Sequence, residues 1–258
     1  MLLLAIPFGL AIGLTVGAVG GGGAILALPV FVYVLDQPVN PASTGSLIVV
    51  ALAAAVGAGS LARHGHVCWR IALTFSAPAA VGSLVGSIAN QAVSGAALIL
   101  AFVPVMLVAA GATWQRAGAA RAEQEGPCPP VPGWEVLVAG FGVGALTGFF
   151  GVGGGFMIVP VLTLWFRVTF RRAVATSLVI ITLTAVAALL SHLAEGARLD
   201  APITIALAGS TAVGALLGTV VAQRVPQAAL GRAFSIVVVG VALFLLVDVV
   251  ALHGPPGG

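Results

Sequence analysis

The chain has 258 residues, of which 60% are hydrophobic and only 7% are charged. A soluble domain carries about 25% charged residues, so this composition excludes a soluble enzyme, a disordered chain and a fibrous protein. It predicts a polytopic integral membrane protein, an all-α bundle of transmembrane helices. The ten basic residues are all arginines in separate loops, which indicates charges that set topology and no nucleic-acid surface.

Apolar stretches, taken in chain order, predict about ten membrane segments separated by polar or Gly/Pro breaks. Most reach the roughly 17–25 residues that span a bilayer. Two of them are much shorter, and each follows a glycine cluster. The predicted segments are 2–19, 24–35, 43–61, 71–88, 95–114, 135–150, 155–166, 173–192, 202–222 and 228–252.

The two halves of the chain match each other on either side of one long polar stretch. An offset of 131 residues pairs glycines, prolines and serines of the halves, and the offset becomes 132 further along. Such a duplication is typical of secondary transporters. We therefore predict a first transmembrane repeat at 1–114, a polar cytoplasmic linker at 115–134 and a second repeat at 135–258. The pairs include Gly9 with Gly140, Gly20 with Gly151, Gly23 with Gly154, Pro29 with Pro160, and Ser46 with Ser177.

Positive charge predicts that the halves have opposite topology. In the first half, Arg63 and Arg70 flank the loop between the third and fourth segments. In the second half the bias reverses, and the loop at 167–172 carries three arginines. Because cytoplasmic loops are enriched in arginine, matching loops favour opposite sides of the membrane, as in an inverted repeat with Gly-rich broken or half helices. This assignment places both termini outside.

The glycine clusters are the first candidate site. A half-helix that begins inside the membrane must direct its unpaired N–H groups toward a cavity, water or a ligand. Helix N-termini favour anions, and glycine lets a ligand approach the backbone closely. Close helix packing through small residues is the alternative interpretation. The candidate residues are Gly20, Gly21, Gly22, Gly23, Gly151, Gly153, Gly154 and Gly155.

Hydroxyl side chains that open the third segment of each half are the second candidate. These are Thr44 and Ser46 in the first half and Thr176 and Ser177 in the second. They are placed to donate hydrogen bonds to the oxygens of an anion. Helix capping, or bonding back to a carbonyl of the same helix, is the alternative role.

The remaining reactive residues predict no chemistry. Cys68 and Cys128 have neither metal-ligand spacing nor the count of a disulfide framework, so we expect neither a disulfide nor a metal site. The apolar segments hold no set of nucleophile, metal ligands or paired carboxylates. We therefore expect no catalytic residue, metal or cofactor, and we do not expect an enzyme.

The glycine clusters with their following prolines, the run Thr176-Ser177-Leu178 and the loop Arg63-His64-Gly65-x-Val67-x-Trp69-Arg70 resemble the TauE/SafE family of bacterial sulfite and organosulfonate exporters. The resemblance covers essentially the whole chain. It implies a multi-pass transporter of the bacterial cytoplasmic membrane that exports sulfite, sulfoacetate or other organosulfonates.

The anion would bind at the interface of the repeats, and in the absence of an ATP-binding motif a gradient would drive export. An anion channel, or a transporter of a different small anion with the same internal site, is the alternative. The expected partners are the anion and the lipid bilayer, and a homo-oligomer is left open. Thr44-Gly45-Ser46 differs from Ala175-Thr176-Ser177, so the resemblance leaves open whether the halves act equally.

Overall fold

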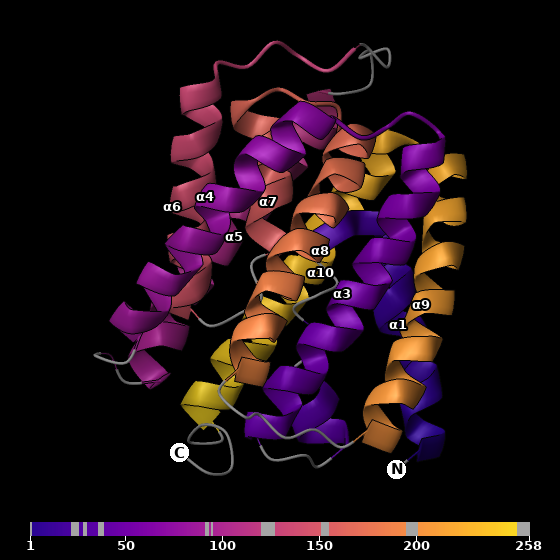
Figure 1. Ribbon diagram of the computed structural model, residues 1–258, viewed down its shortest axis with the longest axis vertical. Helices are drawn as coiled ribbons and strands as arrows, with labels where there is room; N and C mark the ends of the chain where they lie inside the picture. Colours follow the sequence, from indigo (N-terminus) through magenta and orange to yellow (C-terminus); the bar gives the residue numbers. More distant parts are fainter. Residues whose placement is uncertain are drawn as a thin grey trace.

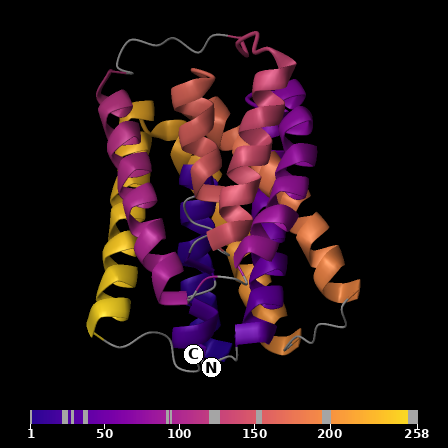
Figure 2. The ribbon, with the colours of Figure 1, turned by 90° about the vertical axis from the view of Figure 1, so that its left-hand side faces the viewer.

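A computed structural model describes residues 2–21, 26–27, 30–35, 39–90, 93, 95–119, 127–150, 155–194 and 201–251 (Figure 1). These residues form helices and no strand, and seven of the helices are long and apolar enough to cross a membrane. The prediction of an all-α transmembrane bundle is therefore confirmed. In Figure 2 the helices stand side by side along one common direction, as a bundle in a bilayer requires.

Most of the predicted segments agree with the helices to within a few residues. The predicted short segment 24–35 is described only in part, and its described end forms a π-helical turn. The helices α5 and α6 extend into both ends of the predicted linker. The elements are α1 (Leu2–Val19), η2 (Val30–Val34), α3 (Val39–Arg63), α4 (Trp69–Asn90), α5 (Gly95–Ala119), α6 (Gly133–Phe150), α7 (Gly155–Pro160), η4 (Val161–Trp165), α8 (Phe170–Ala194), α9 (Ala201–Arg224) and α10 (Gln227–Ala251).

The elements themselves follow the offset that the sequence shows. Adding 131 to the bounds of α1, η2 and α3 gives the bounds of α6, η4 and α8, and adding 132 to those of α5 gives α10. Matching helices run in opposite directions in Figure 1. Helices α1 and α3 run away from the end of the bundle that carries the N-terminus, and α6 and α8 run toward it.

Glycines bring helices of the two halves into backbone contact. Helix α1 lies along α9, and a Cβ atom added at Gly13 or Gly17 would fall on the α9 backbone at Thr211 or Ala215. The matching helices repeat this contact, since α6 lies along α4. There a Cβ at Gly144 would fall on the carbonyl of Ala79. The first helix of each half therefore packs on the fourth helix of the other half, so the halves are interlaced. Small residues serve here as packing surfaces.

Charge and tryptophan gather at the end of the bundle opposite the N-terminus. Arg121 and Arg198 lie outside the described residues, and the other eight arginines all lie where α3, α5 and α9 end and where α4, α8 and α10 begin. The four tryptophans, Trp69, Trp114, Trp134 and Trp165, lie at the same end with roughly half of each side chain exposed. Tryptophan and arginine in this arrangement mark a membrane–water interface.

The packing role of glycine generates a matched test on α6. A Cβ at Gly144 meets backbone of α4, whereas a Cβ at Gly142 meets no atom within 4 Å. Gly144→Leu should lower the free energy of unfolding by about 3 kcal/mol, at the upper end of typical overpacking costs, because neither backbone can move aside. Gly142→Leu should leave it nearly unchanged. Thermal denaturation of the two purified variants measures the difference, and equal midpoints would contradict the seam between α4 and α6.

Candidate functional site

The two glycine segments meet inside the bundle. Gly20 and Gly21 form a tight turn directly after α1, and Gly155 is the first residue of α7. A Cβ added at Gly21 would fall on the carbonyl of Gly155, and a Cβ at Gly155 would lie 2.8 Å from the Cα of Gly21. Only glycine fits at either position. Segments more than 130 residues apart therefore touch backbone to backbone at the point where α1 stops and α7 begins.

At Gly20 the contact also includes the hydroxyl group of Ser177. The φ of Gly20, +77°, lies in the left-handed region that glycine adopts without strain. A Cβ at this position would lie 2.8 Å from the Oγ of Ser177 and 3.2 Å from Val159. Ser177 belongs to α8, and its side chain is fully buried. The structure thus brings four of the predicted site residues together: Gly20, Gly21, Gly155 and Ser177.

Phenylalanine packing connects α6 with α7 in the second half. Phe102 of α5 packs against Phe150, the last residue of α6, with ring centroids 4.9 Å apart. It also packs edge-on against Phe156 at the start of α7, at 5.2 Å. One ring therefore contacts both the last residue of α6 and the first turn of α7.

The hydroxyls of α8 have partners within the protein. The Ser177 hydroxyl donates to the carbonyl of Val174 at 2.8 Å, the back-bonding alternative that the sequence also allows. The Thr176 Oγ1 accepts the backbone N–H of Cys68 at 3.1 Å. Thr176 therefore holds the loop that precedes α4, while Ser177 faces the glycine contact.

The first-half hydroxyls lie at a different depth. Thr44 is buried, Ser46 is partly buried, and a Cβ added at the intervening Gly45 would lie 3.0 Å from Phe31 and 3.1 Å from Thr204. Further along α3, Gly57 faces Leu178 of α8. Ser46 precedes Gly57 by eleven residues, which is roughly 16 Å at 1.5 Å per residue. Ser46 and Ser177 are therefore separated by roughly 15 Å along the bundle axis, and one small anion does not contact both at once.

Five of the predicted site glycines belong to segments outside the described part of the chain. These are Gly22, Gly23, Gly151, Gly153 and Gly154. Within the part of the chain that the structure covers, no group of three or more His, Cys, Asp or Glu side chains is arranged to hold a metal ion.

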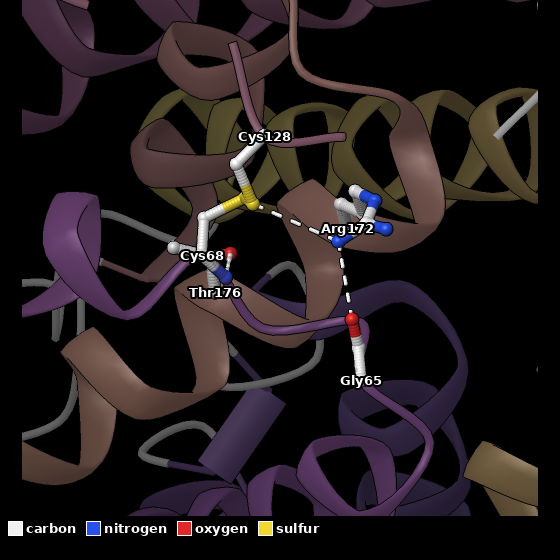
Figure 3. Close-up of a disulfide and its surroundings, with 5 residues drawn as sticks. All are labelled: Gly65, Cys68, Cys128, Arg172 and Thr176. Atoms are coloured by element: carbon white, nitrogen blue, oxygen red, sulfur yellow. Dashed lines mark hydrogen bonds between the residues drawn. A yellow bond between two sulfur atoms is a disulfide. The ribbon is translucent and has the colours of Figure 1, made fainter. Parts of the chain in front are cut away.

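The prediction that the two cysteines are unbonded is wrong. Cys68 and Cys128 form a disulfide, with Cα atoms 5.8 Å apart (Figure 3). The physical reason is the packing of α4 along α6 in the same direction. Cys68 directly precedes α4, and Cys128 precedes α6 by five residues, so both cysteines reach the arginine-rich end together. The sequence already predicts that the two segments with these cysteines lie on the same side of the membrane, and this could have indicated the disulfide.

Arginines at the same end bind the loops to each other. Arg171 donates to the carbonyls of Ala222, Gln223 and Val225 at 3.3–3.4 Å, which caps the end of α9. Arg172 donates to the carbonyl of Gly65 at 3.1 Å and lies 3.6 Å from the Sγ of Cys128. The sequence predicts these arginines as topology signals only, and their contacts within the protein are new information from the structure.

These features define a polytopic helical membrane protein with a polar, glycine-lined contact inside the bundle. Comparison with known proteins agrees with that class. The family model described as "Sulfite exporter TauE/SafE" matches residues 5–245. The chain therefore belongs to the TauE/SafE family and is a membrane transporter, not an enzyme.

Related proteins are named as probable membrane transporters. A "Probable membrane transporter protein" of Xylella fastidiosa strain 9a5c is 32% identical over 254 residues, covering 95% of each chain. One from Methanocaldococcus jannaschii is 24% identical and covers 95% of this chain and 96% of its own. A third, YunE of Bacillus subtilis, is 27% identical and covers 75% of this chain and 79% of its own. No solved structure matches the chain.

A matched pair of glycines tests the contact with Ser177. Gly20 and Gly65 both have positive φ, but a Cβ at Gly65 meets nothing within 4 Å. Gly65→Ala should cost only the left-handed strain of about 1–2 kcal/mol. Gly20→Ala should cost about 1–3 kcal/mol more, because the methyl group also displaces the Ser177 hydroxyl. Chemical or thermal unfolding of both variants measures the difference.

The double variant Gly20→Ala with Ser177→Ala gives the control. Removing the hydroxyl makes room for the new methyl group, so the double variant should be more stable than the sum of the single effects predicts. Strict additivity would show that Gly20 and Ser177 are not in contact.

Proposed function

We propose that the protein is a secondary transporter that exports small sulfur-containing anions, such as sulfite, sulfoacetate or other organosulfonates, across the bacterial cytoplasmic membrane. The observation that supports this most is the contact of Gly20 and Gly21 with Ser177 and Gly155 inside the bundle. The description of the family adds sulfite as the substrate class.

The electrostatics of the bundle favour a site built from backbone and hydroxyls. The eight described arginines lie at one end. Ser177 lies five residues beyond Arg172 on α8, about 7.5 Å further into the bundle, and the bonds of Arg172 go to the carbonyl of Gly65 and the sulfur of Cys128. Helix termini and hydroxyl groups are the remaining donors within the membrane. The Ser177 hydroxyl would turn from the carbonyl of Val174 toward the anion, and glycine would allow the anion to approach the chain.

The separation of Ser46 and Ser177 suggests two stations along one route. We assign Ser177 with Gly20 to the station nearer the arginine-rich end, and Thr44 and Ser46 to its counterpart nearer the other end. In this proposal the stretches 1–114 and 135–258 are inverted repeats joined by a cytoplasmic linker at 115–134. Movement of one repeat against the other would expose the stations alternately, driven by a gradient.

Flux measurements in proteoliposomes test this function. Labelled sulfite and sulfoacetate should enter vesicles at a rate that saturates with concentration, and unlabelled anion on the opposite side should accelerate exchange. A pH gradient applied across the vesicles identifies proton coupling. Current that rises linearly with anion concentration, without exchange, would instead support an anion channel with the same internal site. Vesicles without protein are the control.

Serine variants test the stations. Ser177→Ala removes one donor to a charged group, worth about 1.5–3 kcal/mol in soluble proteins and often below 1 kcal/mol within a membrane. We expect binding of the anion to weaken by roughly 3- to 150-fold. Ser46→Ala should weaken it independently, because the two residues lie at different depths. Ser76→Ala is a matched control, since Ser76 is a buried serine on α4 that donates to the carbonyl of Ala72.

Unchanged affinity in a folded Ser46→Ala/Ser177→Ala double variant would show that these hydroxyls only bond to their own helices. Equal losses in the Ser76→Ala control would indicate a general effect of buried hydroxyls on the fold.

A further inference from the structure

The disulfide lies at the end of the bundle where arginine is concentrated. Eight arginines at one end place that end in the cytoplasm by the positive-inside rule. The cytoplasm keeps thiols reduced, and disulfides that form there in mesophilic organisms are usually transient and redox-sensing. A bond at this location is therefore expected to open and close.

We infer that Cys68 and Cys128 are a reversible thiol–disulfide pair, a redox modification site at the cytoplasmic end that controls the movement of α8 against α4. The effect on transport rests on the proposed function. The thiol chemistry does not, because it depends only on the surroundings of the two sulfur atoms.

The two cysteines differ in access and in charge environment. Cys68 is 2% exposed, whereas Cys128 is partly exposed and lies 3.6 Å from the Nη1 of Arg172. A nearby guanidinium stabilises a thiolate, and the thiolate is the reactive form of cysteine. In the reduced protein Cys128 is therefore the first sulfur to react, and buried Cys68 is the one that completes the bond.

The reaction with a small-molecule disulfide is balanced in two exchange steps. The Cys128 thiolate attacks one sulfur of the small disulfide, forms a mixed disulfide and releases one thiolate. The Cys68 thiolate then attacks the Sγ of Cys128 and releases the second thiolate. The protein loses two electrons and two protons, and the small disulfide gains them as two thiols. Excess small thiol reverses both steps.

Hydrogen bonds connect this pair to the glycine contact. The backbone N–H of Cys68 donates to Thr176, and the next residue on α8 is Ser177, which faces Gly20. Arg172 of α8 joins the carbonyl of Gly65 to the sulfur of Cys128 (Figure 3). With the bond closed, the loop before α4 and the segment before α6 are tied together over the first turns of α8. Closure should therefore restrain α8 and slow any cycle in which the halves move past each other.

Labelling of thiols in cells tests the chemistry. Cells are quenched with acid, and free thiols are labelled with a maleimide–polyethylene glycol that retards the protein on a gel. Growing cells should show two labels per chain, and brief exposure to a permeant small-molecule disulfide should remove both until the reagent is washed out. A chain that stays unlabelled in growing cells, or that never loses its labels, would overturn the inference. The Cys68→Ser variant, which has one cysteine, shows the position of a singly labelled chain on the gel.

Arginine variants test the assignment of Cys128. Arg172→Gln should slow oxidation of the reduced, purified protein by a small disulfide several-fold, and Arg172→Lys should restore part of the rate. Arg70→Gln is the matched control, because Arg70 is an exposed arginine on the first turn of α4. Equal rates for Arg172→Gln and Arg70→Gln would contradict the role of Arg172.

Transport of labelled sulfoacetate in proteoliposomes tests whether the disulfide regulates transport. Sulfoacetate is chosen because sulfite is itself a nucleophile that cleaves disulfides. The oxidised protein should transport about 5- to 150-fold more slowly than the reduced protein, the usual range for coupling between two sites. The Cys68→Ser/Cys128→Ser double variant should not respond to dithiothreitol. Equal transport rates of the unmodified chain in both redox states would overturn the inferred regulation by the disulfide. Absence of flux in both states would contradict the proposed function and leave the labelling result standing.

Discussion

Close backbone contact between helices is the constraint on which this bundle depends. Lipid tails are as apolar as leucine, so helices in a membrane gain little from burying apolar side chains and associate through close packing. Glycines on α1 and α6 let each helix lie directly against the backbone of α9 and α4. Because these contacts cross between the halves, the same glycines that hold each pair of helices also hold the halves to each other. Bulky side chains such as Leu73, Leu84 and Val108 face outward.

The same residue type has a second role where α1 stops and α7 begins. Between packed helices, glycine leaves out a side chain so that the neighbouring helix can lie in its place. At Gly21 and Gly155, glycine lets two chain segments touch backbone to backbone. Interrupted backbone within a membrane requires partners for its polar groups. Phe102 packs against Phe150 and Phe156, and the Ser177 hydroxyl faces Gly20. Glycine thus forms two kinds of close contact in this bundle, helix against helix on α1 and α6 and chain segment against chain segment at Gly21 and Gly155.

The sequence predicts the long helices well because most of them are long apolar runs bounded by arginine, proline or glycine. It also predicts the matching of the halves, since Gly9, Gly13 and Gly17 recur at Gly140, Gly144 and Gly148. It does not predict which helices pair, because small residues occur on most faces and α1 meets α9 only after folding. The same limit explains the disulfide and Thr176. Cys68 meets Cys128, and Thr176 meets the backbone of Cys68, only because α4, α6 and α8 converge at one end.

Interlacing of the halves also sets the order in which the protein is assembled during synthesis. The Ser210 hydroxyl of α9 bonds to the carbonyl of Ala5 on α1, a partner made 205 residues earlier. At about 5–20 residues per second, α1 waits roughly 10 to 40 s in the membrane before α9 emerges from the ribosome. During that interval its glycine face meets lipid or the insertion machinery. Helices α4 and α6 wait for a shorter time, because α6 follows α4 within the first 150 residues. The N-terminal helix reaches its final place only when most of the chain has been translated.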